Sequence, residues 1–107
     1  MTDNPMDSIL SRFPNSVDKA VDLLIQDLSF KDKTKLANLS EKGMVQFHAQ
    51  YGLFIRARFR VPGNDPLVSD CKRIAGLPAL SPEQASYVIF KAMVEKVKTA
   101  GVLKIVK

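Results

Sequence analysis

Helix-start signals recur along this chain, and each precedes a stretch in which apolar residues repeat with the period of an α-helix. Side chains that can cap the first turn of a helix stand at Ser16, Ser29, Ser40, Asp65 and Ser81. Prolines follow Asp65 and Ser81 at the first helical position, where no intrahelical hydrogen bond is lost. The pattern predicts an all-α fold, a compact bundle of about five helices.

The apolar stripes between these caps predict the extent of the helices. The first stripe consists of Val17, Ala20, Val21, Leu24 and Leu28, which share one helical face. The second helix is expected to end near Leu39, the fourth at Gly76 and the fifth near Ala100. Because residues 85–97 are apolar around most of the helix circumference, we expect this last helix at the centre of the bundle.

The stretch between the third and fourth caps is compatible with two secondary structures. Its helical stripe is formed by Met44, Phe47, Tyr51, Phe54 and Ile55, with His48 at the edge. Residues 53–61 also alternate between two faces, so the alternative is an α+β fold with a short hairpin pairing 53–61 with 102–106. We prefer the helix because its period begins earlier, and expect fraying near Ala57, since Arg58 would otherwise enter the apolar face. Leu53 lies opposite the stripe, which predicts a helix covered on two sides.

The length of the chain indicates one domain. Its 107 residues fall within the usual size of a single folded unit, and 46% apolar and 25% charged residues are ordinary values for a globular protein. We expect a single helical domain over residues 16–107. Residues 1–15 are expected to form a peripheral segment, with a short helix from Asn4-Pro5 to Arg12.

The few cysteine and histidine residues limit the chemistry. With one cysteine, Cys71, and one histidine, His48, the chain can form neither an intrachain disulfide nor a four-ligand Cys/His zinc site. We expect no cofactor and no metal. The N-terminus lacks the features of a signal peptide, and no apolar run is long enough for a membrane span, so we expect a cytoplasmic protein that does not bind membranes.

Polar side chains gather beside the third stripe and the turn that follows it. We predict a ligand-binding groove formed by His48, Tyr51, Arg56 and Asn64. In a helix, His48 and Arg56 would be offset by about 80° around the axis, so both could border one groove without touching. Arg56 would donate to an anion and His48 would be a switchable donor. We favour the structural alternative, in which His48 bonds a backbone carbonyl at the core edge and Arg56 pairs with an aspartate or caps a helix, because such polar groups often belong to structural networks.

No catalytic residue is predicted, and we expect that the protein is not an enzyme. Cys71 belongs to a core stripe made of Leu67, Val68, Cys71, Ile74 and Ala75. A free cysteine in such a stripe usually behaves as a small apolar side chain. Asn64 and Asp65 are expected to serve the turn and the next helix cap.

Positive charge is concentrated in the second half of the chain. Residues 1–55 have a net charge of −1, whereas residues 56–107 have a net charge of +6. A possible anion patch consists of Arg56, Arg58, Arg60, Lys72 and Arg73. Binding of nucleic acid or another polyanion is therefore the alternative function. We favour a solvated, partly ion-paired surface, because the spacing matches no nucleic-acid-binding motif.

Several motifs occur in a recognisable order between residues 16 and 97. They are the opening helix from Ser16 to Leu24, His48 followed by Gly52 and Ile55-Arg56, then Gly63-Asn64 with Pro66-Leu67, and finally the Ser81-to-Ser86 helix start. In these motifs the chain resembles a family of small, mainly bacterial domains of unknown function. It differs from that family in having Ala57 after Arg56 and no tryptophan. The resemblance implies a helical fold and draws attention to His48, Arg56 and Asn64.

Together these observations predict an uncharacterised small domain whose role is to bind another macromolecule. No catalytic signature accompanies the polar groove, so we expect a non-enzymatic protein-interaction module with a protein partner of unknown identity. Nucleic acid is the less favoured partner. Arg56→Ala should then abolish binding and leave the melting temperature nearly unchanged, whereas a large loss of stability would identify Arg56 as structural.

Overall fold

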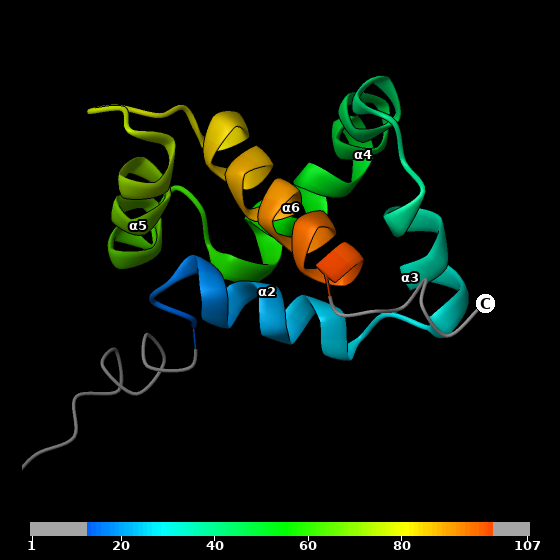
Figure 1. The fold of residues 1–107 in the computed structure, drawn as a ribbon. Coiled ribbons are helices and arrows are strands. Elements are labelled where there is room, and N and C mark those ends of the chain that lie inside the picture. The colour runs from blue at the N-terminus through cyan, green and yellow to red at the C-terminus, as the bar shows by residue number, and fades with distance from the viewer. Residues whose placement is uncertain (1–12, 100–107) are drawn as a thin grey trace, which may run out of the picture.

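The computed structural model describes residues 13–99, which form five α-helices and no strand (Figure 1). The helices are α2 (Val17–Gln26), α3 (Phe30–Ala37), α4 (Glu41–Phe59), α5 (Asp65–Ala75) and α6 (Pro82–Thr99). The predicted all-α fold is thereby confirmed. The short helix predicted for residues 4–12 and the predicted end near Ala100 lie outside the described residues. None of the helices within residues 13–99 combines the length and apolarity that crossing a membrane requires.

The predicted serine caps begin four of the helices. The hydroxyl groups of Ser16, Ser29 and Ser40 each accept a hydrogen bond from the backbone N–H three residues later, at 3.2, 3.1 and 3.0 Å. Ser81 and Gln84 form the predicted reciprocal capping box, with bonds of 3.0 and 2.8 Å. These local interactions explain why the sequence located the helix starts correctly.

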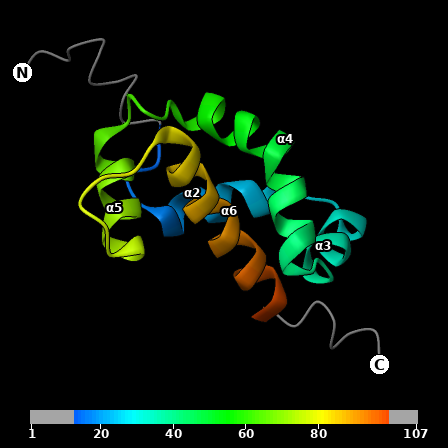
Figure 2. The ribbon, with the colours of Figure 1, turned by 90° about the horizontal axis from the view of Figure 1, so that it is seen from above.

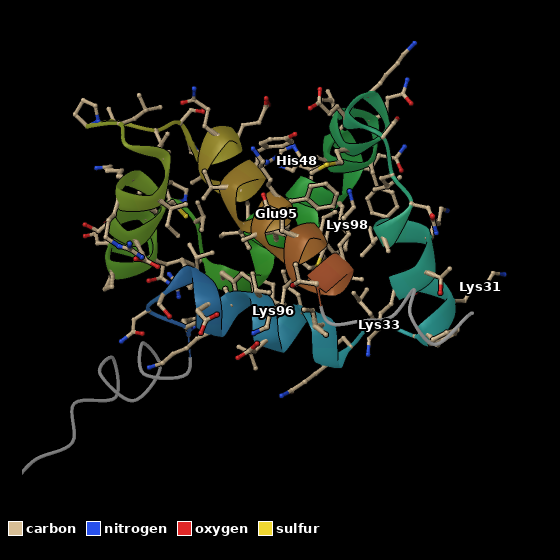
Figure 3. All side chains as sticks on the ribbon, in the orientation of Figure 1. Lys31, Lys33, His48, Glu95, Lys96 and Lys98 are labelled. Carbon is tan, nitrogen blue, oxygen red and sulfur yellow. The ribbon has the colours of Figure 1, made fainter. Side chains whose placement is uncertain are left out.

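The last helix, α6, is the centre of the bundle, as predicted. It contacts all four other helices, and α3 and α5 lie at opposite ends of the molecule (Figures 1 and 2). Its buried face consists of Ala85, Ser86, Ile89, Phe90, Met93, Val94 and Val97. The Lys96 ammonium pairs with Asp18 and Asp22, one turn apart on α2, and ties the outer face of α6 to that helix (Figure 3).

The preferred helix over this stretch is confirmed, but two predictions for α4 are wrong. The helix continues to Phe59 without fraying at Ala57, because the Arg58 guanidinium turns outward to pair with Asp27 and lies 5.6 Å from the Phe59 ring. The hairpin alternative is excluded, since residues 53–59 are helical. Leu53 is 62% exposed, so α4 is covered on one side and not on two.

The fourth predicted helix, α5, begins and packs differently from the prediction. Its N-cap is Asn64, whose side chain accepts from the Leu67 N–H, and Asp65 is the first helical residue. The helix ends at Gly76 as predicted, because this glycine adopts a left-handed conformation with φ of 70°. Of the predicted core stripe, Ile74 and Ala75 are exposed, so only the first two turns of α5 pack into the core.

The start of α2 also depends on a contact that no local pattern indicated. The Asp70 carboxylate of α5 accepts a 2.7 Å hydrogen bond from the Val17 N–H and a 2.9 Å bond from Arg73. Burial alone would raise the pKa of Asp70, but these hydrogen bonds lower it overall. The carboxylate therefore acts as a second cap for α2, supplied by a helix 53 residues away.

Candidate functional site

The candidate site begins with His48, which α4 holds against α6. His48 is only 8% exposed, and Figure 3 shows it between the two helices. Its ring lies edge-on to Tyr87 with centroids 5.1 Å apart, and 5.8 Å from the ring of Phe90. Two aromatic side chains of α6 therefore fix the plane of the imidazole.

The Ser86 hydroxyl of α6 joins His48 to Arg56. The Nε2 atom of His48 lies 2.9 Å from Ser86 Oγ, and Arg56 Nη1 donates to the same oxygen at 2.8 Å. Ser86 in turn donates its proton to the Glu83 carbonyl at 2.9 Å. A hydroxyl has one proton and two lone pairs, so His48 must donate from Nε2 and the hydrogen-bonding capacity of Ser86 is used completely.

This geometry corrects the expected arrangement of His48 and Arg56. They do not border a groove separately, but converge on one hydroxyl 38 and 30 residues further along the chain. Their partner is neither the carbonyl nor the carboxylate of the structural alternative. Ser86 was missed, although its position three and four residues before the buried Ile89 and Phe90 placed a hydroxyl on the core face of α6. A polar group on that face requires a partner.

Gly52 leaves the space in which this network forms. A Cβ atom at this position would lie 2.5 Å from His48 Nε2 and 3.0 Å from Arg56 Nη1. Those distances are shorter than van der Waals contact, so any side chain at position 52 would displace His48 or Arg56. The glycine therefore makes room for two side chains.

Burial and charge keep His48 neutral. Burial lowers the pKa of His48 below its ordinary value of 6.5, and the positive charge of Arg56 lowers it further, while Glu83 opposes both. The neutral ring carries its proton on Nε2, as the bonds of Ser86 require. His48 is therefore a fixed hydrogen-bond donor at neutral pH.

An apolar groove opens beside His48. Its volume is about 430 Å³, and we call it the His48 groove. It is lined by Val45, His48, Ala75, Leu77, Leu80, Glu83, Gln84, Tyr87 and Val88. Val45 is 61% exposed and Leu77 46% exposed, so two apolar side chains from opposite walls lie open to solvent. Of the four residues predicted to share a groove, only His48 lines this one.

A second groove lies along α4 and is lined partly by aromatic rings. Its volume is about 510 Å³, and we call it the aromatic groove. Its lining consists of Asp27, Leu28, Asp32, Phe47, Gln50, Tyr51 and Phe54. The predicted site residue Tyr51 belongs here, separated from the His48 groove by the ring of Phe90, which lies 5.8 Å from His48 and 6.0 Å from Tyr51.

Asn64 has a structural role at the turn after α4. Its amide group donates to the carbonyls of Pro14 and Phe59 at 2.9 and 3.1 Å, and its side-chain oxygen caps α5. All three bonds are internal to the protein, and the residue is buried. Asn64 therefore holds the chain before α2 against the end of α4, and it lines neither the His48 groove nor the groove that contains Tyr51.

The residues of the predicted anion patch have separate partners. Arg56 bonds Ser86, Arg58 pairs with Asp27, and Arg73 pairs with Asp70 at 2.8 Å. Arg60 lies over the ring of Phe13 at 5.9 Å. The fifth member, Lys72, lies in the last turn of α5. Because these partners belong to different elements, the described residues offer no single surface on which the predicted patch would act as a unit.

The remaining candidate for chemistry, Cys71, is fully buried. Its thiol donates a weak hydrogen bond to the Ala85 carbonyl at 3.5 Å. Burial raises the pKa of Cys71 to about 11, with a smaller contribution from Asp70, so the thiol remains protonated at neutral pH. Within residues 13–99, no group of three or more His, Cys, Asp or Glu side chains is arranged to hold a metal ion.

Comparison with known proteins assigns the chain to a family. No curated protein and no solved structure matches it significantly. A family model described as a domain of unknown function, DUF6794, matches residues 13–97. The match covers α2 to α5, most of α6 and the residues that line both grooves. On this match the chain belongs to the DUF6794 family of domains of unknown function.

Proposed function

We propose that this domain is a non-enzymatic protein-interaction module that binds an amphipathic helix of a partner protein in the His48 groove. The observation that supports this most is the pair of exposed apolar side chains, Val45 and Leu77, on opposite walls of an open groove. Exposed apolar surface that forms a concave patch is typical of sites where another protein docks.

The chemistry of the groove favours a helical ligand with one polar edge. Its walls are mostly aliphatic, and its only carboxylate is that of Glu83, in the first turn of α6. A helix that inserts apolar residues at helical spacing would bury Val45 and Leu77. A lysine or arginine at the edge of that helix would find Glu83 at the rim. Apolar contacts would thus supply the affinity and the carboxylate the orientation.

The internal hydrogen bonds beside the groove support a role without catalysis. His48 Nε2 lies as close to Ser86 Oγ as a catalytic base lies to its nucleophile. The serine hydroxyl is, however, fully buried and already bonded to three partners. The Cys71 thiol is buried and protonated. Neither group is available to attack a substrate, so binding is the activity for which the groove is suited.

The proposal is tested by comparing two exposed apolar positions of α4. Tagged wild-type chain, Val45→Asp and Leu53→Asp are used to capture partners from the native lysate after nuclease treatment, and the captured proteins are quantified by mass spectrometry. Both positions are about 60% exposed, so both variants should keep the wild-type melting temperature within a few degrees. A partner that is retained by wild type and Leu53→Asp and lost by Val45→Asp is the expected result.

Two results would contradict the proposal. A partner that Val45→Asp retains does not use the His48 groove. Recovery that disappears with nuclease would instead support the predicted binding of nucleic acid, which should also weaken steeply as salt is raised.

A further inference from the structure

The aromatic groove has a composition that the proposed interaction does not use. Phe47, Tyr51 and Phe54 follow one another along one side of α4 at helical spacing. The Phe47 and Tyr51 centroids are 5.7 Å apart, and those of Tyr51 and Phe54 are 5.4 Å apart. The rings therefore form a continuous row, of which the last, Phe54, is 48% exposed.

Two carboxylates face this row from the other side of the groove. Asp27 follows the end of α2, and Asp32 lies in the first turn of α3. Both carboxylates affect the pKa of the Tyr51 hydroxyl. Burial raises the pKa of Tyr51, and the negative charges of Asp27 and Asp32 raise it further, against the opposing effect of Arg58. The groove thus combines aromatic faces with negative charge around one central ring.

The chain's own cations show that these rings attract positive charge. The Lys35 ammonium lies 5.8 Å from the centre of the Phe47 ring, and the Arg58 guanidinium 6.0 Å from that of Phe54. Arg58 also pairs with Asp27. Among residues 13–99, Asp32 forms no ion pair. Neither Lys35 nor Arg58 lies over the Tyr51 ring or pairs with the Asp32 carboxylate.

We propose that the aromatic groove binds an alkylammonium cation, with its alkyl stem along the Phe47–Tyr51–Phe54 row and its charged head beside Asp32. A primary ammonium on a short aliphatic stem matches both parts of the lining. The stem replaces water on the apolar faces, and the head gains both the aromatic quadrupole and the carboxylate. A free polyamine and the lysine side chain of a protein share this chemistry.

The first test is an NMR titration of the full-length chain with n-butylammonium chloride at constant ionic strength. 1-Butanol provides the neutral control with the same stem, and sodium chloride controls for charge alone. We expect saturable shifts of the backbone amides that line the aromatic groove with the ammonium and not with either control. Equal saturation by 1-butanol would overturn the proposal, because the groove would then be a general apolar site. An absence of saturable shifts would also overturn it.

Variants at exposed positions locate the ligand. Asp32→Asn removes the carboxylate and Phe54→Leu removes an aromatic face while keeping apolar bulk. Each should weaken n-butylammonium binding by about threefold. The matched control is Glu41→Gln, which removes an exposed carboxylate from the first turn of α4 outside the groove and should leave the affinity unchanged. Wild-type affinity in both groove variants, with melting temperatures close to wild type, would contradict the assignment.

Two further ligands separate the sources of the cation. Spermidine represents a free polyamine, and the capped tripeptide acetyl-Gly-Lys-Gly-amide represents a lysine side chain. Tighter binding of spermidine would assign the groove to free polyamines, and tighter binding of the tripeptide to a basic protein segment. Either order supports the ammonium site. Because Val45 and Leu77 do not line this groove, failure here leaves the proposed interaction at the His48 groove untouched.

Discussion

His48 and Tyr51 are three residues apart on α4, and the side chain of Phe90 separates them. On the His48 side, the polar groups of His48, Arg56 and Ser86 are turned toward one another and satisfied inside the protein. On the Tyr51 side, Phe54 and the Asp32 carboxylate are exposed to solvent, and the Phe47 and Tyr51 rings are half-buried.

The difference arises from what lies opposite each side of α4. Opposite His48, the helix α6 supplies a buried hydroxyl at hydrogen-bond distance. Opposite Tyr51, the end of α2 and the start of α3 supply carboxylates at the rim of an open groove. The neighbouring element therefore decides whether a polar residue on α4 is bonded inside the protein or lines an open groove, and its residue type alone does not.

The largest expected effect comes from truncating Phe90, whose ring separates His48 from Tyr51. Phe90 is fully buried and its ring stacks on Phe47 at 5.7 Å. Phe90→Ala should lower the free energy of unfolding by about 3–5 kcal/mol, because it leaves a cavity in the core. Urea denaturation measures this loss. By NMR we expect the backbone amides that line both grooves to shift. Shifts in one groove only would show that Phe90 does not support the other groove.

Replacement of Gly52 by alanine should disturb the hydrogen bonds of His48 and Arg56 with Ser86 and leave the aromatic groove unchanged. Gly52→Ala should lower the free energy of unfolding by about 1–3 kcal/mol, because its Cβ displaces His48 or Arg56 from Ser86. Gly43→Ala is the matched control on the same helix. The nearest atoms to its Cβ would be Leu39 Cδ2 and Ser40 Oγ, both at 3.3 Å, and His48 and Arg56 are not among its neighbours. The gain in helix propensity of up to about 1 kcal/mol should therefore offset the crowding.

These two variants are compared by thermal and urea denaturation, and n-butylammonium binding is measured in parallel. Gly52→Ala should keep wild-type affinity at the aromatic groove, since position 52 does not line it. A stability at or above wild type for Gly52→Ala would show that the contacts of His48 and Arg56 with Ser86 contribute little.

The pH dependence of stability should also originate on the His48 side. The pKa of His48 is lowered by folding, so the unfolded chain binds a proton more readily than the folded chain. The contribution of neutral His48 is fully present above its ordinary pKa of 6.5 and is lost as the pH falls below that value. Urea denaturation at about pH 7.5 and about pH 5.5 should therefore show lower stability at the acidic value.

The variant His48→Gln identifies the source of this loss. Glutamine retains a side-chain donor and does not titrate, so the stability of the variant should change less between the two pH values. Asp70 and Cys71 do not interfere, because the pKa of Asp70 lies below its ordinary value of 3.8 and that of Cys71 is about 11. An equal loss in wild type and variant would assign the pH dependence to other groups.

The smallest effect is expected at Tyr51. Tyr51→Phe keeps the ring contacts with Phe47 and Phe54 and removes only a hydroxyl from a half-buried side chain. The free energy of unfolding should change by less than about 0.5 kcal/mol. Urea denaturation of Tyr51→Phe and Gly52→Ala under the same conditions compares the two variants directly. A loss of unfolding free energy above about 1 kcal/mol for Tyr51→Phe would place Tyr51 in a structural network like that of His48.

The candidate site was predictable only in part. His48 and Arg56 attracted attention because they are polar side chains beside an apolar stripe, and the structure brings them together. Their partner Ser86 was missed because 38 residues separate it from His48. Asp27 and Asp32 were not expected to face Tyr51, since the turn between α2 and α3 decides where they point. Leu53 was expected to be covered, but it is 62% exposed.

What the sequence determined by itself is the set of helices. Caps such as Ser16 and Ser81, and stripes at helical spacing, act within one or two turns, so their effect does not depend on the rest of the fold. The tertiary structure alone decided which helix faces which. Only the packing of α4 on α6 brings His48 and Arg56 to Ser86. Only the fold places Asp27, Leu28 and Asp32 beside three aromatic residues of α4 to form a groove, because such contacts join residues distant in the chain.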